Sequence, residues 1–237
     1  SLFLSTGTGL LPMTRPIIGV TTSHLRGWRS WQFQRLAIWR AGGLAKRLTA
    51  SRVPNPKDCI SSLDGLVIGG GDDIDLTLYG GTLDLKIRYD PERDALERAL
   101  LEATTDQPLP ILGVCRGAQM LALWRGGTLI QDIYSHYPAL PRLRTVFPKL
   151  GITVQENTRL HSILQRPSLR VNSLHHQSIN DPGDAMQIVA CDRRGVTQAI
   201  EHTGDRFMVG VQWHPEYMPQ KPAQLRLYKA LIATIQR

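Results

Sequence analysis

Long apolar stretches and cysteine are both scarce in this sequence of 237 residues. No apolar run approaches the ~20 residues that span a bilayer, which argues against a transmembrane helix. The three cysteines, Cys59, Cys115 and Cys191, are odd in number and far apart. A disulfide scaffold is therefore not expected, and neither is a zinc site built from four cysteines. We expect a reduced, cytoplasmic protein.

Acidic residues are missing from one segment in particular. The 28 Lys and Arg against 20 Asp and Glu give a formal net charge of +8. Between His24 and Pro56 there are seven basic residues and no acidic one, interleaved with tryptophan and phenylalanine. No zinc-finger, basic-zipper or RNP-type signature accompanies this segment, so nucleic acid is not the favoured partner. A solvated helix face and a site that attracts carboxylates both stay open.

The composition indicates one folded domain. Apolar residues make up 42% of the chain and charged residues 20%, without internal repeats or a low-complexity linker. A length of 237 residues suits a single α/β domain with a sizeable core. Residues 1–12 lack the basic region of a signal peptide and precede Met13, so we expect a leader or a remnant there and one domain over 13–237.

The first half alternates predicted strands and helices. Short apolar runs suit buried strands at three places: 16–21, 63–68 and 109–114. A helix is predicted after each run, with Ser30 as the cap of the first and Asp90 followed by Pro91 opening the second. Glycine pairs at 42–43 and 126–127 are expected to end the first and third helices. This order predicts a parallel sheet with helices on both faces.

The second half follows a different pattern. Residues 136–165 carry several prolines and arginines and are predicted to be loop-rich or peripheral. Short, closely spaced strands are expected at 170–173, 187–191, 196–201 and 207–212, followed by a helix over about 222–235. We therefore predict a single-domain α/β fold with a mostly parallel central sheet flanked by helices. An antiparallel extension is expected in the C-terminal half.

The chemistry of the sequence centres on GVCRG at residues 113–117. This G-x-C-x-G pattern falls between a predicted strand and a predicted helix, where a nucleophile elbow would place Cys115 at the helix N-terminus. The helix dipole there favours thiolate over thiol. Because cysteine is also among the most buried residue types, a structural role for Cys115 is an equal alternative on this motif alone.

Two further segments favour a catalytic site. An apolar strand ends in His214-Pro215-Glu216, so the histidine can face the cysteine while the carboxylate holds the imidazole from behind. A triple glycine at 69–71 follows another strand, where a backbone N–H can stabilise a developing oxyanion together with the N–H of Arg116. A strand-end histidine is more often structural, and a triple glycine alone is only a turn.

The combination of these segments resembles a known family. GVCRGAQML, GGTLIQDI, VNSLHHQSI and GVQWHPE together resemble the class I glutamine amidotransferase superfamily, and most closely its peptidase C26 branch of γ-glutamyl-γ-aminobutyrate hydrolases. DGLVIGGGDDID, LYGG and YDPERDALE also match that branch in order and spacing. The resemblance covers nearly everything from Met13 onward and implies a flavodoxin-like α/β fold.

The resemblance also implies roles for individual residues. Cys115 matches the family nucleophile, His214 the general base and acid, and Glu216 the residue that orients the histidine. The backbone N–H groups of Gly71 and Arg116 match the oxyanion hole. Matches to substrate-binding positions are Gln119, Asn172, Ser173, His175 and His176, although a buried histidine pair can simply satisfy backbone groups.

The implied reaction is hydrolysis of a small γ-glutamyl amide through a γ-glutamyl thioester, in polyamine (putrescine) catabolism. It requires no metal and no organic cofactor. The expected partner is the small γ-glutamyl substrate rather than a membrane or nucleic acid, and a homo-oligomer stays open. A glutaminase subunit that passes ammonia to a synthetase is the second hypothesis, and a catalytically silent binding protein is the third.

Three departures from the family pattern leave the nucleophile untouched. Leu76-Thr77 follows Asp75 where a proline is usual, and Thr197-Gln198-Ala199 carries an amide where an acid is usual. LAKRLT replaces the usual apolar run after Gly43. These changes make the amine released from the substrate the least determined part of the hypothesis.

Overall fold

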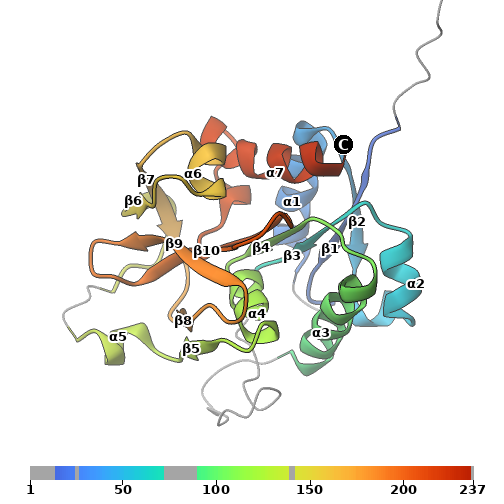
Figure 1. The fold of residues 1–237 in the computed structure, drawn as a ribbon, viewed down its shortest axis with the longest axis horizontal. Coiled ribbons are helices and arrows are strands. Elements are labelled where there is room, and N and C mark those ends of the chain that lie inside the picture. Colours follow the sequence, from blue (N-terminus) through green and yellow to red (C-terminus); the bar gives the residue numbers. More distant parts are fainter. Residues whose placement is uncertain (1–13, 25–26, 72–89, 139–141, 236–237) are drawn as a thin grey trace, which may run out of the picture.

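The computed structural model describes residues 14–24, 27–71, 90–138 and 142–235. Its centre is a nine-stranded sheet of order β2-β1-β3-β4-β11-β10-β9-β6-β7 (Figure 1). The strands of this sheet are β1 (Ile17–Thr21), β2 (Leu44–Leu48), β3 (Gly65–Ile68), β4 (Ile111–Val114), β6 (Thr145–Val154), β7 (Ser168–Ser173), β9 (Met186–Asp192), β10 (Thr197–His202) and β11 (Met208–Val211). A separate antiparallel pair joins β5 (Thr128–Ile130) to β8 (Ser178–Asp181).

Pairing directions confirm the predicted division of the sheet. β2, β1, β3, β4 and β11 pair in parallel, whereas β10, β9, β6 and β7 extend the sheet by antiparallel pairing. The carboxyl ends of β3, β4 and β11 therefore meet at one edge, which is where open α/β sheets place their ligand sites. The fold class is α/β with one mixed sheet, as predicted.

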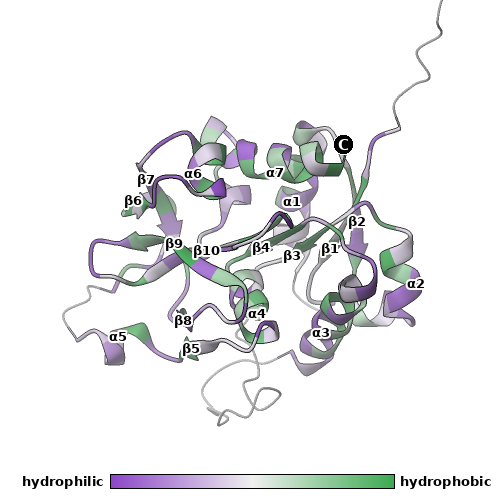
Figure 2. Cartoon of the chain, viewed as in Figure 1, coloured by the Kyte–Doolittle hydropathy of each residue, from purple (hydrophilic) through white to green (hydrophobic). Residues whose placement is uncertain are grey.

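Helices cover both faces of the sheet. They are α1 (Trp28–Ala41), α2 (Pro56–Ser61), α3 (Pro91–Asp106), α4 (Arg116–Trp124), α5 (Ile133–His136), α6 (Arg159–Leu164) and α7 (Pro222–Ile235). One buried cluster packs α1, α6 and α7 against the sheet, and a second packs α2, α3 and α4 against the opposite face. Hydrophobic residues gather on the central strands, while α2 and α3 carry hydrophilic residues on their outer sides (Figure 2). None of the described helices is long and apolar enough to cross a membrane.

Helix boundaries follow the predicted punctuation with one exception. Asp90 accepts a hydrogen bond from the backbone N–H of Arg93 and Pro91 opens α3, as expected. Gly42 ends α1 in the left-handed region, at φ +104°. The Ser30 cap is wrong, because α1 begins two residues earlier at Trp28, with Gly27 as N-cap and no side-chain cap.

The prediction of loops at 136–165 is also wrong. This segment contains the ten-residue strand β6 and the short helix α6. Most of β6 is exposed or half-buried, and only Ile152 and Val154 near its end are buried. Such a strand shows too little apolar alternation for detection.

Two further elements of the first half escaped prediction. The LAKRLT segment forms β2, an edge strand that pairs with β1 alone, and α2 follows it. Lysine and arginine are common on edge strands, where they discourage pairing with other chains. The chain therefore contains one more strand and helix before β3 than the predicted alternation.

Candidate active site

The backbone turns sharply at Cys115, between β4 and α4. Cys115 adopts φ +51° and ψ −106°, a conformation that a residue with a Cβ rarely occupies. Its backbone N–H donates to the carbonyl of Val211 on the neighbouring strand at 2.7 Å. The neighbouring Gly117 supplies room rather than a positive φ, because a Cβ there would overlap the carbonyl oxygen of Ile68. Strand, helix and β3 thus hold the strained residue from three sides.

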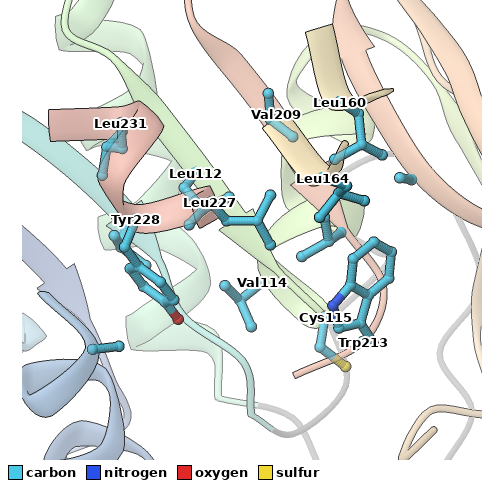
Figure 3. Close-up of a cluster of buried hydrophobic side chains, with 14 of the residues drawn as sticks. Leu112, Val114, Cys115, Leu160, Leu164, Val209, Trp213, Leu227, Tyr228 and Leu231 are labelled. Carbon is cyan, nitrogen blue, oxygen red and sulfur yellow. The ribbon is translucent and has the colours of Figure 1, made fainter. Parts of the chain in front are cut away.

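Cys115 lies at one end of the cluster that α7 and the central strands form (Figure 3). Its side chain is 6% exposed, so the surroundings of the thiol are mostly protein atoms. The side-chain amide of Gln212 donates to Sγ at 3.6 Å. An N–H donor in this position stabilises a thiolate more than a thiol, as does the start of α4.

His214 and Glu216 form the second part of the site. The carboxylate Oε1 of Glu216 accepts from Nδ1 of His214 at 2.8 Å, and this leaves Nε2 for Cys115. Both side chains are almost fully buried. Burial by itself lowers the pKa of His214, but the neighbouring Cys115 and Glu216 outweigh it and hold that pKa well above 6.5. The imidazole is therefore poised to hold a proton and to give it up to a leaving group.

The ring of His214 is fixed by further contacts. Tyr217 stacks on it, with ring centroids 5.1 Å apart and planes 16° from parallel. The side-chain amide of Asn172 accepts from the backbone N–H of His214 at 2.8 Å and donates to its carbonyl at 2.9 Å. On the other side, a Cβ on Gly70 would lie 2.5 Å from Cε1 of the ring, so only glycine leaves space there.

The glycine segment is held from below by Arg93. The guanidinium of Arg93 donates to the carbonyl oxygens of Gly69 at 2.7 Å and of Gly70 at 3.0 Å. Since the described peptide bonds are all trans, the C=O of Gly70 and the N–H of Gly71 point in opposite directions. The N–H of Gly71 is therefore directed away from Arg93.

A buried ion cluster in turn holds Arg93. Its Nε donates to Glu97 at 2.8 Å, and Glu97 also accepts from the hydroxyl of Thr21 at 2.6 Å and from the side chain of Arg116. Arg116 pairs with Asp94 as well. Two guanidinium groups thus face two carboxylates, and all four side chains are at most 3% exposed. The cluster ties the glycine segment on β3 to the first turn of α4.

The predicted substrate-binding residues fall into two groups. Asn172 is occupied with the backbone of His214, and Gln119 donates to Gln212 Oε1 at 3.1 Å and to the carbonyl of Gln177 at 3.2 Å. Ser173 and His175 line a cavity beside the site. His176 is half-buried next to them, and its carbonyl accepts from Ile133. Asp75 to Thr77 lie outside the described residues.

Several contributors were not singled out from the sequence. Gln212 and Tyr217 flank the histidine motif, and their proximity along the chain was the available signal. Arg93 and Glu97 are spaced i, i+4 on α3, a pattern that usually marks an exposed helix pair. Nothing in the spacing shows that this particular pair is buried. Among the described residues, no group of His, Cys, Asp and Glu side chains could hold a metal ion.

The fold belongs to the class I glutamine amidotransferase type. A solved structure of a "putative GMP synthase" protein from Thermoplasma acidophilum superposes with a TM-score of 0.67 at 21% identity, over 94% of this chain and 96% of that one. The chain is a member of the peptidase C26 family, whose model matches residues 16–216.

Named relatives agree with this assignment. "Putative glutamine amidotransferase Rv2859c" of Mycobacterium tuberculosis is 36% identical over 94% of this chain and 75% of its own length. Gamma-glutamyl-gamma-aminobutyrate hydrolase PuuD of Escherichia coli K12 is 30% identical over 94% of this chain and 95% of its own length. These comparisons support a glutamine amidotransferase-like hydrolase.

Proposed function

We propose that this protein hydrolyses the γ-glutamyl amide bond of a small γ-glutamyl compound, with Cys115 as nucleophile and His214 and Glu216 completing a catalytic triad. The observation that carries the proposal is the strained Cys115 at the start of α4, facing an imidazole whose Nδ1 is bonded to a buried carboxylate. The relative named gamma-glutamyl-gamma-aminobutyrate hydrolase matches over nearly the whole chain and supports the substrate class.

In the first half-reaction the thiolate of Cys115 attacks the γ-carbonyl carbon, and a C–S bond forms while the carbonyl electrons move to oxygen. The backbone N–H groups of Gly71 and Arg116 stabilise the resulting oxyanion. When the tetrahedral intermediate collapses, the C–N bond breaks and the imidazolium of His214 protonates the departing amine. A γ-glutamyl thioester remains on the enzyme.

In the second half-reaction the neutral imidazole removes a proton from water, and the hydroxide attacks the thioester carbonyl. Collapse of this intermediate breaks the C–S bond and releases glutamate and the thiolate. The proton taken from water returns the ring to its starting imidazolium form. Glu216 keeps Nδ1 protonated throughout, so that Nε2 performs every proton transfer.

The alternative is a glutaminase that delivers ammonia to a synthetase, which the name of the Mycobacterium relative favours. We expect γ-glutamyl-GABA to be hydrolysed with a kcat/KM at least about tenfold above that for glutamine, since a hydrolase gains from binding the amine as well as the glutamyl group. Glutamate release from both compounds at equal, low concentrations measures the ratio. Equal or faster hydrolysis of glutamine would favour the glutaminase.

A further inference from the structure

A cavity of about 600 Å³ lies beside the candidate site, within the size range of small-molecule sites. Its walls come from β6, β7, the turn between β9 and β10, and the start of α5. Figure 1 shows these elements together on the side of the molecule opposite α2. The mechanism above uses none of the residues in this wall.

Strand register places the cavity along the same sheet edge as Cys115. Ala199 pairs with Val211 antiparallel, so β10 begins where β11 ends. The end of β9 pairs with the beginning of β10, and Ile152 of β6 lies opposite Asp192. The cavity therefore lies at the carboxyl edge of β4 and β11 and not across the sheet from them.

Two hydrogen-bonded connections link the cavity wall to the thiol. The backbone carbonyl of Gln198 accepts from the N–H of Gln212 at 2.8 Å, and Gln212 contacts Sγ of Cys115. His175 donates to the carbonyl of Gln177, the same oxygen that accepts from Gln119, and Gln119 donates to Gln212. The wall and the nucleophile are thus separated by a single residue.

The inner wall presents hydrogen-bond acceptors without a protein partner. Burial lowers the pKa of His175 to about 4, so its ring is neutral near pH 7. Its Nδ1 must carry the proton, because the partner is a carbonyl oxygen, and Nε2 is left as an acceptor. Within the described part of the chain, neither this Nε2 nor the buried Oε1 of Gln198 has a hydrogen-bond partner. A ligand that brings N–H groups would satisfy both.

The outer wall is strongly cationic. Lys149, Arg170, Arg193 and Arg194 all line the cavity. None of the four forms an ion pair with another residue that the structure describes. The one carboxylate in the wall, Asp192, accepts from the backbone N–H groups of Arg194 and Val196 and holds the turn in place.

We propose that this cavity is a subsite for an acidic extension of the γ-glutamyl substrate, bound by Lys149, Arg170, Arg193 and Arg194. The inference rests on the proposed function. Four cations exceed what one carboxylate requires, so the preferred substrate carries at least two negative charges beyond the scissile amide. The acidic groups can stand on the leaving amine or on an acyl group attached to the α-amino nitrogen, and their chemistry toward the cavity is the same.

Two matched ligand series test the subsite. γ-Glutamylbutylamide, γ-glutamyl-GABA and γ-glutamylglutamate add one carboxylate at a time to the amine. N-butanoyl and N-succinyl γ-glutamylbutylamide differ by one carboxylate on the α-amino side. Dissociation constants are measured by calorimetry on the Cys115→Ala protein, which does not consume the ligand. We expect each carboxylate in the recognised series to tighten binding about fivefold, with weaker gains at high salt.

Substitution of the cations assigns the effect to the cavity. The double variant Arg170→Gln/Arg194→Gln should remove most of the gain per carboxylate. Arg166→Gln, an exposed arginine between α6 and β7 that does not line the cavity, removes a nearby positive charge and should leave the gain in place. A gain in either series that depends on the cavity cations supports the subsite, and the series in which it appears identifies the acidic end.

Equal affinities across both series, or a gain that survives the double variant, would overturn the subsite. Failure of the proposed function is seen separately, because hydrolysis of the uncharged γ-glutamylbutylamide by the wild-type protein does not involve the cavity cations. Binding to Cys115→Ala, conversely, does not depend on the chemistry.

Discussion

Replacing His214 by alanine should lower kcat/KM for a γ-glutamyl amide by about 10³-fold, with the protein still folded. The ring has to hold a proton for the leaving amine and then accept one from water, and no neighbour can take both roles. His175 is a poor substitute, because its pKa is about 4 and its Nδ1 is bonded to the carbonyl of Gln177. Steady-state kinetics on one substrate, with circular dichroism to verify folding, gives the comparison.

Glu216→Gln provides the matched, milder variant. Glutamine keeps the shape but removes a negative charge that helps to raise the pKa of His214. The loss should be about 10- to 100-fold, comparable to one charged hydrogen bond. Because the lost carboxylate favoured the imidazolium, the pKa of His214 should fall, and activity should decline at a lower pH on the alkaline side. A folded His214→Ala protein with near-normal activity would show that His175 or His176 is the base.

The second large effect should follow replacement of Glu97 by alanine. This substitution leaves Arg93 and Arg116 buried with one carboxylate between them, and an unpaired buried charge costs about 3–5 kcal/mol. Urea unfolding should show that loss in the free energy of unfolding. The remaining folded protein should also have a lower kcat, because Arg93 no longer holds the carbonyls that direct the N–H of Gly71.

Glu102→Ala is the control on the same helix. Glu102 pairs with Arg98 at the same i, i+4 spacing, but both side chains are about half exposed. An exposed pair of this kind contributes about 0–1 kcal/mol. Similar destabilisation by the two substitutions would mean that the buried cluster does not stabilise the fold in the way described.

The parallel part of the fold was predictable because its strands are buried on both sides. β3 and β4 read as short, continuous apolar runs between turn residues. β2 and β6 lack that signal, since edge position and partial exposure allow charged side chains such as Lys46 and Lys149. Local sequence thus identifies strands in the core and misses those whose partners come from distant segments.

The three central site residues were predictable for a similar reason. Cys115, His214 and Glu216 stand in local motifs that end central strands, and neighbouring parallel strands bring those ends together. The contacts of Gln212 with the thiol and of Glu97 with Arg116 depend on packing between elements far apart in sequence. The sequence also assigned the strained backbone angles to glycine, whereas the structure places the positive φ on Cys115 itself.

The basic segment over residues 24–56 divides in a way that sequence could not show. Arg47 donates to Thr22 and Ser23, and Arg40 to the carbonyl of Pro219, so these arginines hold loops in place. Trp28 and Trp39 are more than half exposed. The expectation that this segment attracts carboxylates stays a prediction, while the cationic cavity wall offers a second location for that role.

The central claim is that Cys115 carries the glutamyl group during turnover. The direct measurement is mass spectrometry of protein quenched with acid during steady-state hydrolysis of γ-glutamyl-GABA, followed by peptide mapping. We predict a glutamyl adduct on Cys115, increased in amount by Glu216→Gln if deacylation becomes limiting, and none on Cys59 or Cys191, whose thiol pKa values are raised by burial. Turnover without any glutamyl adduct, or with the adduct on another residue, would contradict the account.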